Sequence, residues 1–155
     1  MELSKNGLDL IKSFEGLRLS AYLDSASVPT IGYGSIMYPS GIAVKEGDTI
    51  TEQQAEDLLS WEINIKTSAV STYVLPVTLN QNQFDSLVSF AYNEGCGALH
   101  GSTLLKLILA NPSNPAITNQ FCVWDKIHVD GQLISSAGLL NRRRKEAELY
   151  FTPMN

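Results

Sequence analysis

Cysteine and histidine are scarce in this sequence, and no apolar stretch is long. The two cysteines, Cys96 and Cys122, stand in no C-x-x-C pattern, and the two histidines, His100 and His128, are isolated. This distribution argues against a metal site such as zinc. Buried free thiols are the first expectation for the cysteines, and a disulfide is the alternative in an oxidising compartment. No run reaches the roughly 18 apolar residues of a membrane-spanning helix, so no membrane span is expected.

Positive charge is also scarce. The 11 Lys and Arg residues stand against 16 Asp and Glu, which gives a net charge of −5 at pH 7. A nucleic-acid binder normally carries a basic surface, so this class of partner is not expected. The one basic run, Arg142–Lys145, is interpreted as the solvated face of a C-terminal helix, with contact to anionic polymers as the alternative.

The N-terminus lacks a secretion signal of the Sec type. Its first residues, MELSKNGLDL, contain no basic region followed by an apolar region. The 155 residues, 44% of them hydrophobic, suffice for one domain with a real core. Neither an internal repeat nor a low-complexity linker divides them, so we expect a single domain over residues 1–155.

Helix signals begin at Ser4, which is a favourable N-cap. Leu8, Ile11 and Phe14 recur at helical spacing, and Gly16 offers a C-terminal stop. These residues predict a first helix that ends close to Gly16.

Turn residues dominate the next stretch, from residue 17 to about residue 50, and predict a small β region. A capping box at Thr51–Gln54 then opens a helix that extends to about Tyr73. Asn80 can cap another helix, which carries an apolar stripe on one face. Further helices are predicted over residues 103–110, 115–122 and 137–150.

These elements predict an α+β fold that is predominantly helical. A small N-terminal β lobe would cover residues 17–50, and an interlobe helix would cover about 52–73. A larger α lobe would take residues 80–155 together with the N-terminal helix. A cleft flanked by two such lobes is a place where a polymer could bind.

Three residues suit the hydrolysis of a glycosidic bond, which needs one protonated and one ionised carboxyl group. Glu15 stands at the predicted end of the first helix, where the helix dipole and apolar neighbours both disfavour a charged carboxylate. Asp24 lies in a turn, and Thr30 follows on the returning strand with a hydroxyl that can help to hold water. Taken singly, each also has an ordinary structural interpretation: an exposed glutamate, a turn aspartate and a β-branched strand residue.

The order and spacing of these residues resemble a known family. Residues 14–18 (FEGLR), 21–24 (AYLD) and 29–34 (PTIGYG) are similar to the catalytic region of glycoside hydrolase family 24. This family contains the phage T4-type lysozymes and related endolysins, and the spacing Glu-x8-Asp-x5-Thr matches its catalytic triad. Further landmarks of the family follow in the same order, at residues 47–55, 82–93, 102–105 and 138–143. The resemblance therefore covers nearly the whole chain.

The resemblance implies a lysozyme-like fold and a muramidase (N-acetylmuramidase) activity. Glu15 would protonate the leaving glycosidic oxygen, while Asp24 and Thr30 would position and activate water on the opposite face, giving inversion. The substrate would be the β-1,4 bond between N-acetylmuramic acid and N-acetylglucosamine in bacterial peptidoglycan, and no metal or cofactor is implied. The candidate substrate-binding residues are Tyr33, Ile36, Tyr92, Asn93, Thr103 and Asn141. Of these, Tyr33 and Asn93 are additions to the positions that match the family.

Two positions depart from the family pattern. Ser35 follows the Gly-x-Gly element where the family usually has a histidine, which puts the local stability of the β lobe in question. Glu94 stands where an apolar residue is more usual. If Glu94 faced the cleft it could shift neighbouring pKa values, and if it faced solvent it would have no effect.

Three alternatives to a hydrolytic endolysin are open at this point. A catalytically silent lysozyme fold would only bind glycan. A lytic transglycosylase would cleave the same bond without water, usually with a single glutamate. An antibacterial effector delivered into a competitor would share the same chemistry.

The resemblance also implies where the protein would act. It would be made in the host cytoplasm and would reach the cell wall in the periplasm after release, with a holin lesion as the expected route. The lack of a separate wall-binding module is more usual where the wall is thin, as in Gram-negative hosts. We expect a monomer.

Overall fold

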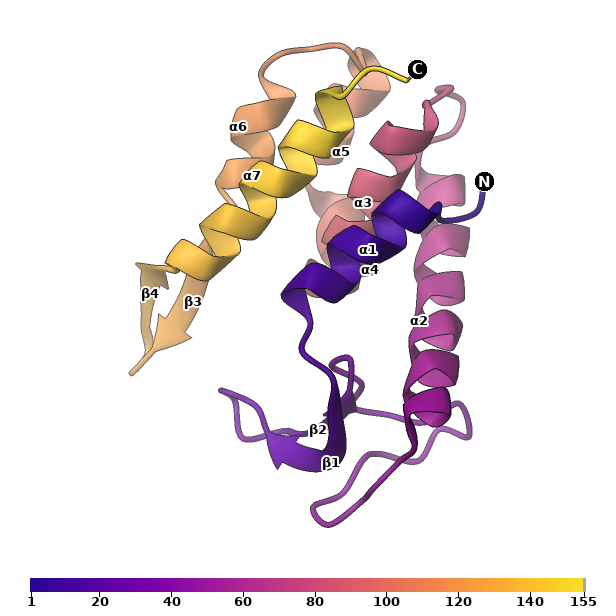
Figure 1. The fold of residues 1–155 in the computed structure, drawn as a ribbon. Helices are drawn as coiled ribbons and strands as arrows, with labels where there is room; N and C mark the ends of the chain where they lie inside the picture. Colours follow the sequence, from indigo (N-terminus) through magenta and orange to yellow (C-terminus); the bar gives the residue numbers. More distant parts are fainter. Residues whose placement is uncertain (155) are drawn as a thin grey trace. The chain divides into compact units, whose positions relative to one another are not determined.

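Helices account for most of residues 1–154, which the computed structural model describes (Figure 1). The helices are α1 (Lys5–Phe14), α2 (Glu52–Tyr73), α3 (Gln81–Glu94), α4 (Cys96–Gly101), α5 (Thr103–Ala110), α6 (Ile117–Cys122) and α7 (Ala137–Phe151). The strands are β1 (Arg18–Leu23), β2 (Pro29–Gly32), β3 (Lys126–Val129) and β4 (Gln132–Ser135). The predicted α+β class with a predominance of helix is confirmed.

The chain divides into two compact units. One unit, here called the β unit, contains residues 11–65, and the other, here called the helical unit, contains residues 1–10 and those from 66 onward. The division falls inside α1 and inside α2, so each of these helices contributes residues to both units. That the two units form a single domain with a cleft between them stays a prediction.

The β unit is built on the antiparallel pair β1–β2. Tyr22 pairs with Thr30 and Leu23 pairs with Pro29, while the register shifts between Arg18 and Tyr22. Such an irregularity bends a strand locally. The predicted turn at residues 24–27 lies between the two strands.

A small core holds the rest of the β unit together. Ile31, Val44 and Leu58 are buried against one another, which ties β2, the following loop and α2 into one cluster. The helix α2 begins where the sequence predicted it. The Thr51 amide donates to Gln54 Oε1 at 2.8 Å and the Gln54 amide donates to Thr51 Oγ1 at 3.1 Å, which is a complete capping box.

The helical unit is centred on α3, which packs against α7. Its N-cap is Asn80, as predicted, with a reciprocal capping box to Gln83. Aromatic rings extend the core from α3 to the C-terminal helices: Phe90 meets Phe121 and Trp124 edge-to-face, with ring centroids 5.9 and 5.4 Å apart. The aromatic part of the core of this unit therefore lies where Phe90 of α3 meets Phe121 of α6 and the following Trp124.

The basic run on α7 is not a solvated face over its whole length. Arg142 and Arg143 are buried, with 4% and 0% of their surface exposed, and only Arg144 and Lys145 are exposed. The prediction was wrong for the first two because Glu146, fully buried one turn later, forms ion pairs with both arginines. A buried cation persists in a fold when a carboxylate compensates its charge.

The position of Glu94 follows from the same arrangement. Its carboxylate lies 2.6 Å from Arg143 Nη1, so it supplies a second anion to this buried guanidinium. Glu94 therefore has a structural partner on α7, which neither of the two predicted orientations had included.

One hairpin and one short helix were not predicted. The strands β3 and β4 form an exposed hairpin whose turn residues Asp130 and Gly131 both have positive φ, at 49° and 78°. An Asp-Gly pair is the usual sequence of such a turn, so the signal was present in the sequence. The short helix α4 was also missed, because Gly95 and Gly97 in its vicinity indicate a break and not a helix start.

The remaining predictions from composition concern thiols, membrane spans and metal sites. Cys96 and Cys122 are free and half-buried, which agrees with the expectation of free thiols and not with a disulfide. None of the helices in residues 1–154 is long and apolar enough to cross a membrane. Within the same residues, no cluster of three His, Cys, Asp or Glu side chains could hold a metal ion.

Candidate active site

Glu15 follows directly on the last residue of α1. Its amide still donates to the Ile11 carbonyl at 3.1 Å, so its backbone completes the last helical turn. The side chain is half-buried, which leaves its carboxyl group accessible to a substrate. The end of α1 therefore fixes the backbone position of Glu15, as the sequence predicted.

The backbone of Gly34 lies beside this carboxyl group. A Cβ atom at position 34 would lie 3.4 Å from Glu15 Oε2, about van der Waals contact, so the Gly34 backbone lies near the carboxylate. The φ of Gly34 is 103°, a conformation that L residues rarely adopt. The backbone angle therefore favours glycine at position 34, whereas the space beside Glu15 would admit a Cβ atom.

Asp24 occupies the turn that follows β1, and one of its oxygens is used by the turn. Oδ1 accepts hydrogen bonds from the amides of Ala26 and Val28, each at 2.8 Å. This is the local bonding expected of a turn aspartate. Within residues 1–154 no donor reaches Oδ2, so the second oxygen of the half-buried carboxyl group can accept a hydrogen bond from a ligand or water.

Thr30 lies on β2 and is buried, with 4% of its surface exposed. Its hydroxyl donates to the Val28 carbonyl at 2.9 Å. Because the hydroxyl proton is engaged in this bond, the lone pairs of Oγ1 are left to accept a hydrogen bond. Asp24 and Thr30 thus each offer an acceptor, and the same short turn orients both.

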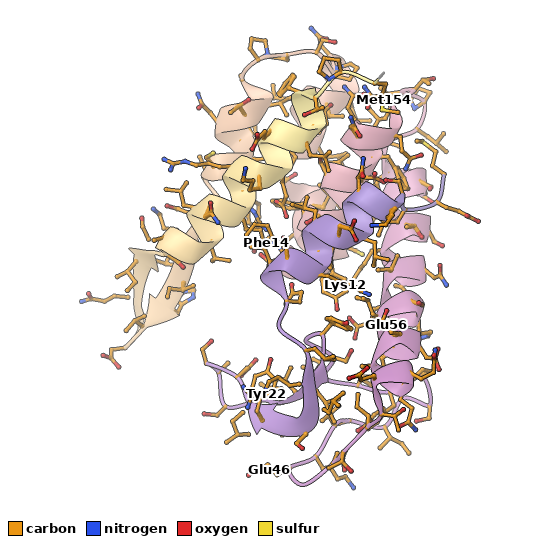
Figure 2. All side chains as sticks on the ribbon, in the orientation of Figure 1. Lys12, Phe14, Tyr22, Glu46, Glu56 and Met154 are labelled. Carbon is orange, nitrogen blue, oxygen red and sulfur yellow. The ribbon has the colours of Figure 1, made fainter. Side chains whose placement is uncertain are left out.

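A second polar group in the β unit joins Lys12, Tyr33 and Glu56. The Lys12 ammonium lies 2.8 and 2.7 Å from the two carboxylate oxygens of Glu56. The Tyr33 hydroxyl donates to Glu56 Oε1 at 2.8 Å, and Lys12 Nζ lies 5.2 Å from the centroid of the Tyr33 ring. Figure 2 shows the side chains of Lys12 and Glu56 pointing toward one another.

This group is electrostatically coupled. The hydrogen bonds from Lys12 and Tyr33 hold the pKa of Glu56 below its usual value. The same carboxylate raises the pKa of Lys12, chiefly through their hydrogen bond, and raises the pKa of Tyr33. The carboxylate and the ammonium are therefore both stabilised in their charged forms.

The candidate substrate-binding residues are distributed over both units. In the β unit, Ile36 is 50% exposed and available for contact, whereas Tyr33 is 9% exposed and its hydroxyl is taken by Glu56. In the helical unit the candidates lie on α3, at the start of α5 and on α7: Tyr92, Asn93, Thr103 and Asn141. Asn93, Thr103 and Asn141 are exposed, and Tyr92 is half-buried.

Asn93 is oriented by the buried arginine of α7. Arg143 Nη2 donates to Asn93 Oδ1 at 2.9 Å, which fixes the carbonyl end of the amide. The exposed Nδ2 group then remains as a hydrogen-bond donor at the surface of the helical unit.

Comparison with known proteins decides the family. Residues 12–146 match the family model described as phage lysozyme. The chain belongs to the phage lysozyme family. The endolysin of Salmonella phage P22 is 39% identical over 153 residues, which cover 98% of this chain and 99% of that relative. The resemblance predicted from the sequence is confirmed.

Solved structures agree. The endolysin from Escherichia coli O157:H7 phage FAHEc1 has a TM-score of 0.90 and 44% identity, covering 97% of this chain and 94% of that chain. The muramidase domain of SpmX from Asticaccaulis excentricus has a TM-score of 0.84 and 33% identity, covering 98% and 99%. This phage lysozyme is thus a peptidoglycan hydrolase with a lysozyme-like fold.

Sequence reasoning did not single out two residues that contact the candidate residue Tyr33. Lys12 and Glu56 contact Tyr33, but neither stands in a segment that resembles the catalytic region of the family. The only sequence signal is that Lys12 precedes Glu15 by three positions, which places the two on neighbouring parts of one helix face.

Proposed function

We propose that this phage lysozyme hydrolyses the β-1,4 bond between N-acetylmuramic acid and N-acetylglucosamine with inversion at the anomeric carbon. The observation that carries the proposal is the common anchoring of Asp24 and Thr30 to Val28. It leaves Asp24 Oδ2 and Thr30 Oγ1 as acceptors for the two protons of one water molecule. A water held in this way presents a lone pair to the sugar.

The proposed roles follow from this arrangement. Glu15 donates its proton to the glycosidic oxygen as the bond to the anomeric carbon breaks. The water held by Asp24 and Thr30 attacks from the opposite face, and Asp24 accepts the proton that the water loses. Inverting enzymes need carboxyl groups about 6.5–9.5 Å apart so that the water fits between, and we expect this separation for Glu15 and Asp24.

The exposed candidate substrate-binding residues would hold the glycan strand. Ile36 supplies an apolar surface for a sugar face, and Asn93 supplies an amide donor for an acetamido carbonyl or a hydroxyl group. Tyr92, Thr103 and Asn141 complete the proposed set of contacts. Tyr33 is better suited to supporting the site than to touching sugar, because its hydroxyl is already bound to Glu56.

The cellular setting is part of the proposal. The protein would act as a monomer on the cell wall of a bacterial host, after release from the cytoplasm through a holin lesion. Expression in a host with and without a co-expressed holin tests the route. Lysis that needs the holin would support it, and lysis by the enzyme alone would contradict it.

The test of the chemistry uses Glu15→Gln on purified peptidoglycan. Wild type should reduce turbidity and release fragments with reducing muramic ends, whereas Glu15→Gln should be inactive. Its stability should be unchanged or improved, because the substitution removes an unfavourable charge from a helix C-terminus. Glu46→Gln is the matched control, since Glu46 is exposed on a loop of the β unit and should not affect turnover.

Each outcome is informative. Inverted anomers in early nuclear magnetic resonance spectra would support the water-activation step, and retained anomers would contradict it. Anhydro-muramic ends would indicate a lytic transglycosylase. No lysis by folded wild type would leave a catalytically silent glycan-binding fold.

A further inference from the structure

Glu56 connects three segments of the β unit. Its carboxylate receives the ammonium of Lys12 from α1 and the hydroxyl of Tyr33 from the loop after β2, while Glu56 itself lies in the first turns of α2. The contacts of Lys12 span 2.7–2.8 Å and that of Tyr33 is 2.8 Å, so all are full hydrogen bonds. Such charge-assisted bonds are stronger than neutral ones.

Two of these segments carry Glu15 and the Gly34 backbone beside it. Lys12 lies one helical turn before Glu15, and Glu15 continues that turn through its bond to the Ile11 carbonyl. Tyr33 is the residue directly before Gly34, and a Cβ atom at position 34 would lie 3.4 Å from Glu15 Oε2, so the Gly34 backbone lies beside the acid. The Glu56 carboxylate therefore ties the helix that carries the acid to the backbone that lies against the acid.

The chain on the other side of Gly34 is held by bonds that do not involve Glu56. Ser35, the residue after Gly34, exchanges backbone hydrogen bonds with Ile31 in both directions at 2.9 Å. Gly34 thus lies between one neighbour held by backbone pairing and another held by its side chain. Only the second attachment, through Tyr33, depends on Glu56.

We propose that Glu56 is a positioning residue for the general acid, acting through Tyr33 and Lys12 to hold the Gly34 backbone against the Glu15 carboxyl group. The inference rests on the proposed function of Glu15. Releasing Tyr33 frees the loop to move away from Glu15, and the acid then samples orientations that do not point at the glycosidic oxygen. Misplacement of a catalytic group by about 1 Å lowers turnover by as much as roughly a hundredfold.

The first test is Tyr33→Phe, which removes a single hydroxyl and keeps the ring. The matched control is Tyr38→Phe in the same unit, because the Tyr38 hydroxyl donates to Asp48 at 2.9 Å in a comparable tyrosine–carboxylate bond. Both variants are assayed on a soluble peptidoglycan oligosaccharide well below their melting temperatures. We expect kcat of Tyr33→Phe to fall about tenfold with KM unchanged, and kcat of Tyr38→Phe to stay near the wild-type value.

The second test separates positioning from general stability. Glu56→Gln keeps an amide oxygen that can accept the Tyr33 hydroxyl, while Glu56→Leu keeps the bulk and removes every acceptor. We expect kcat to decrease in the order wild type, Glu56→Gln, Glu56→Leu, even where the variants are matched for folded fraction by circular dichroism. Should Glu56→Leu fail to fold, the comparison of Glu56→Gln with wild type still decides the question.

Failure of the inference and failure of the proposed function differ in result. Active wild type, inactive Glu15→Gln and equal kcat values for Tyr33→Phe and Tyr38→Phe would overturn the positioning role alone. A rise in KM without a fall in kcat would also overturn it, since it would make Tyr33 a substrate contact. An inactive but folded wild type would overturn the proposed function and the inference with it.

Discussion

Asp24 and Thr30 donate hydrogen bonds to the same acceptor, the carbonyl oxygen of Val28. The Asp24 amide reaches it at 3.0 Å and the Thr30 hydroxyl at 2.9 Å. The Val28 amide in turn binds Asp24 Oδ1 at 2.8 Å. One residue, Val28, thus orients both side chains through its N–H and its C=O, without any direct contact between Asp24 and Thr30.

Replacement of Thr30 tests the use of its oxygen. Thr30→Val keeps the shape of the buried side chain but removes the acceptor, so kcat should fall by about ten- to a hundredfold, at the low end of what general base catalysis contributes. The Val28 carbonyl keeps the Asp24 amide as a donor, so the loss in the free energy of unfolding should be about 1 kcal/mol. Steady-state assays and urea denaturation measure the two effects.

Thr30→Ser is the matched control, because it restores the hydroxyl and should recover most of the wild-type kcat. Equal activity of the valine and serine variants would mean that Asp24 holds the water alone.

The pH dependence of stability follows from two carboxylates in the β unit. The pKa of Glu56 is lowered by hydrogen bonds from Lys12 and Tyr33, and the pKa of Asp48 is lowered by the Lys45 amide and then by the Tyr38 hydroxyl. A carboxylate with a depressed folded-state pKa stabilises the fold above its ordinary pKa, 4.5 for Glu56 and 3.8 for Asp48. This stabilisation is lost as the pH falls through the folded-state value.

The melting temperature should therefore fall as the pH drops below these two values. Glu56→Gln should be less stable than wild type at neutral pH, and the difference should shrink in the acid range, where the wild-type carboxylate is protonated. A difference that stays constant over the titration would show that the Glu56 charge does not contribute to stability.

The sequence predicted those parts of the fold that local chemistry determines. The capping box at Thr51 and the N-cap residue Asn80 marked the starts of α2 and α3, and the turn around Asp24 marked the β1–β2 pair. Burial of Arg142 and Arg143 was not predicted, because a basic run ordinarily faces water and the decisive partner, Glu146, becomes buried only through packing against α3.

In the candidate site, too, local features were predicted and a contact between distant segments was not. The spacing of Glu15, Asp24 and Thr30 pointed to a family, and in the structure the side chains of Asp24 and Thr30 both bond to Val28. The link between Tyr33 and Glu56 could not be predicted, since it joins a loop to a helix that follows much later in the chain. A hydrogen bond between distant segments leaves no periodic pattern in the sequence.

Ser35 offers a test of an unfavourable buried group. Its side chain is 1% exposed, and its hydroxyl finds no hydrogen-bond partner within residues 1–154. Because a buried hydroxyl without a partner loses its hydration and gains nothing in return, Ser35→Ala should raise the free energy of unfolding by up to about 1 kcal/mol.

The contrast is Ser89→Ala, in which an equally buried hydroxyl donates to Glu146 Oε1 at 2.7 Å. Loss of this bond to a charged group should lower the free energy of unfolding by about 1.5–3 kcal/mol. Opposite signs for the two serines are expected from urea denaturation, and a destabilised Ser35→Ala would mean that its hydroxyl is bonded in solution.

Arg143 provides the largest expected effect on stability. Its guanidinium is fully buried, lies 2.6 Å from Glu94 and 2.8 Å from Glu146, and stands 4.9 Å from the centroid of the Phe90 ring. Burial already raises the pKa of Glu146, and the arginines oppose this shift. Arg143→Met removes the main compensating charge and should cost about 3–5 kcal/mol in urea denaturation.

The neighbouring Arg144 is exposed on the same helix, so Arg144→Met is the matched control and should change stability by no more than about 0.5 kcal/mol. Arg143→Lys should not restore stability, because one ammonium cannot reproduce the planar set of donors that contacts Asn93, Glu94 and Glu146. If both methionine variants were equally stable, the charge of Glu146 would be compensated by Arg142 alone, and the position of Arg143 in the core would rest on packing against Phe90.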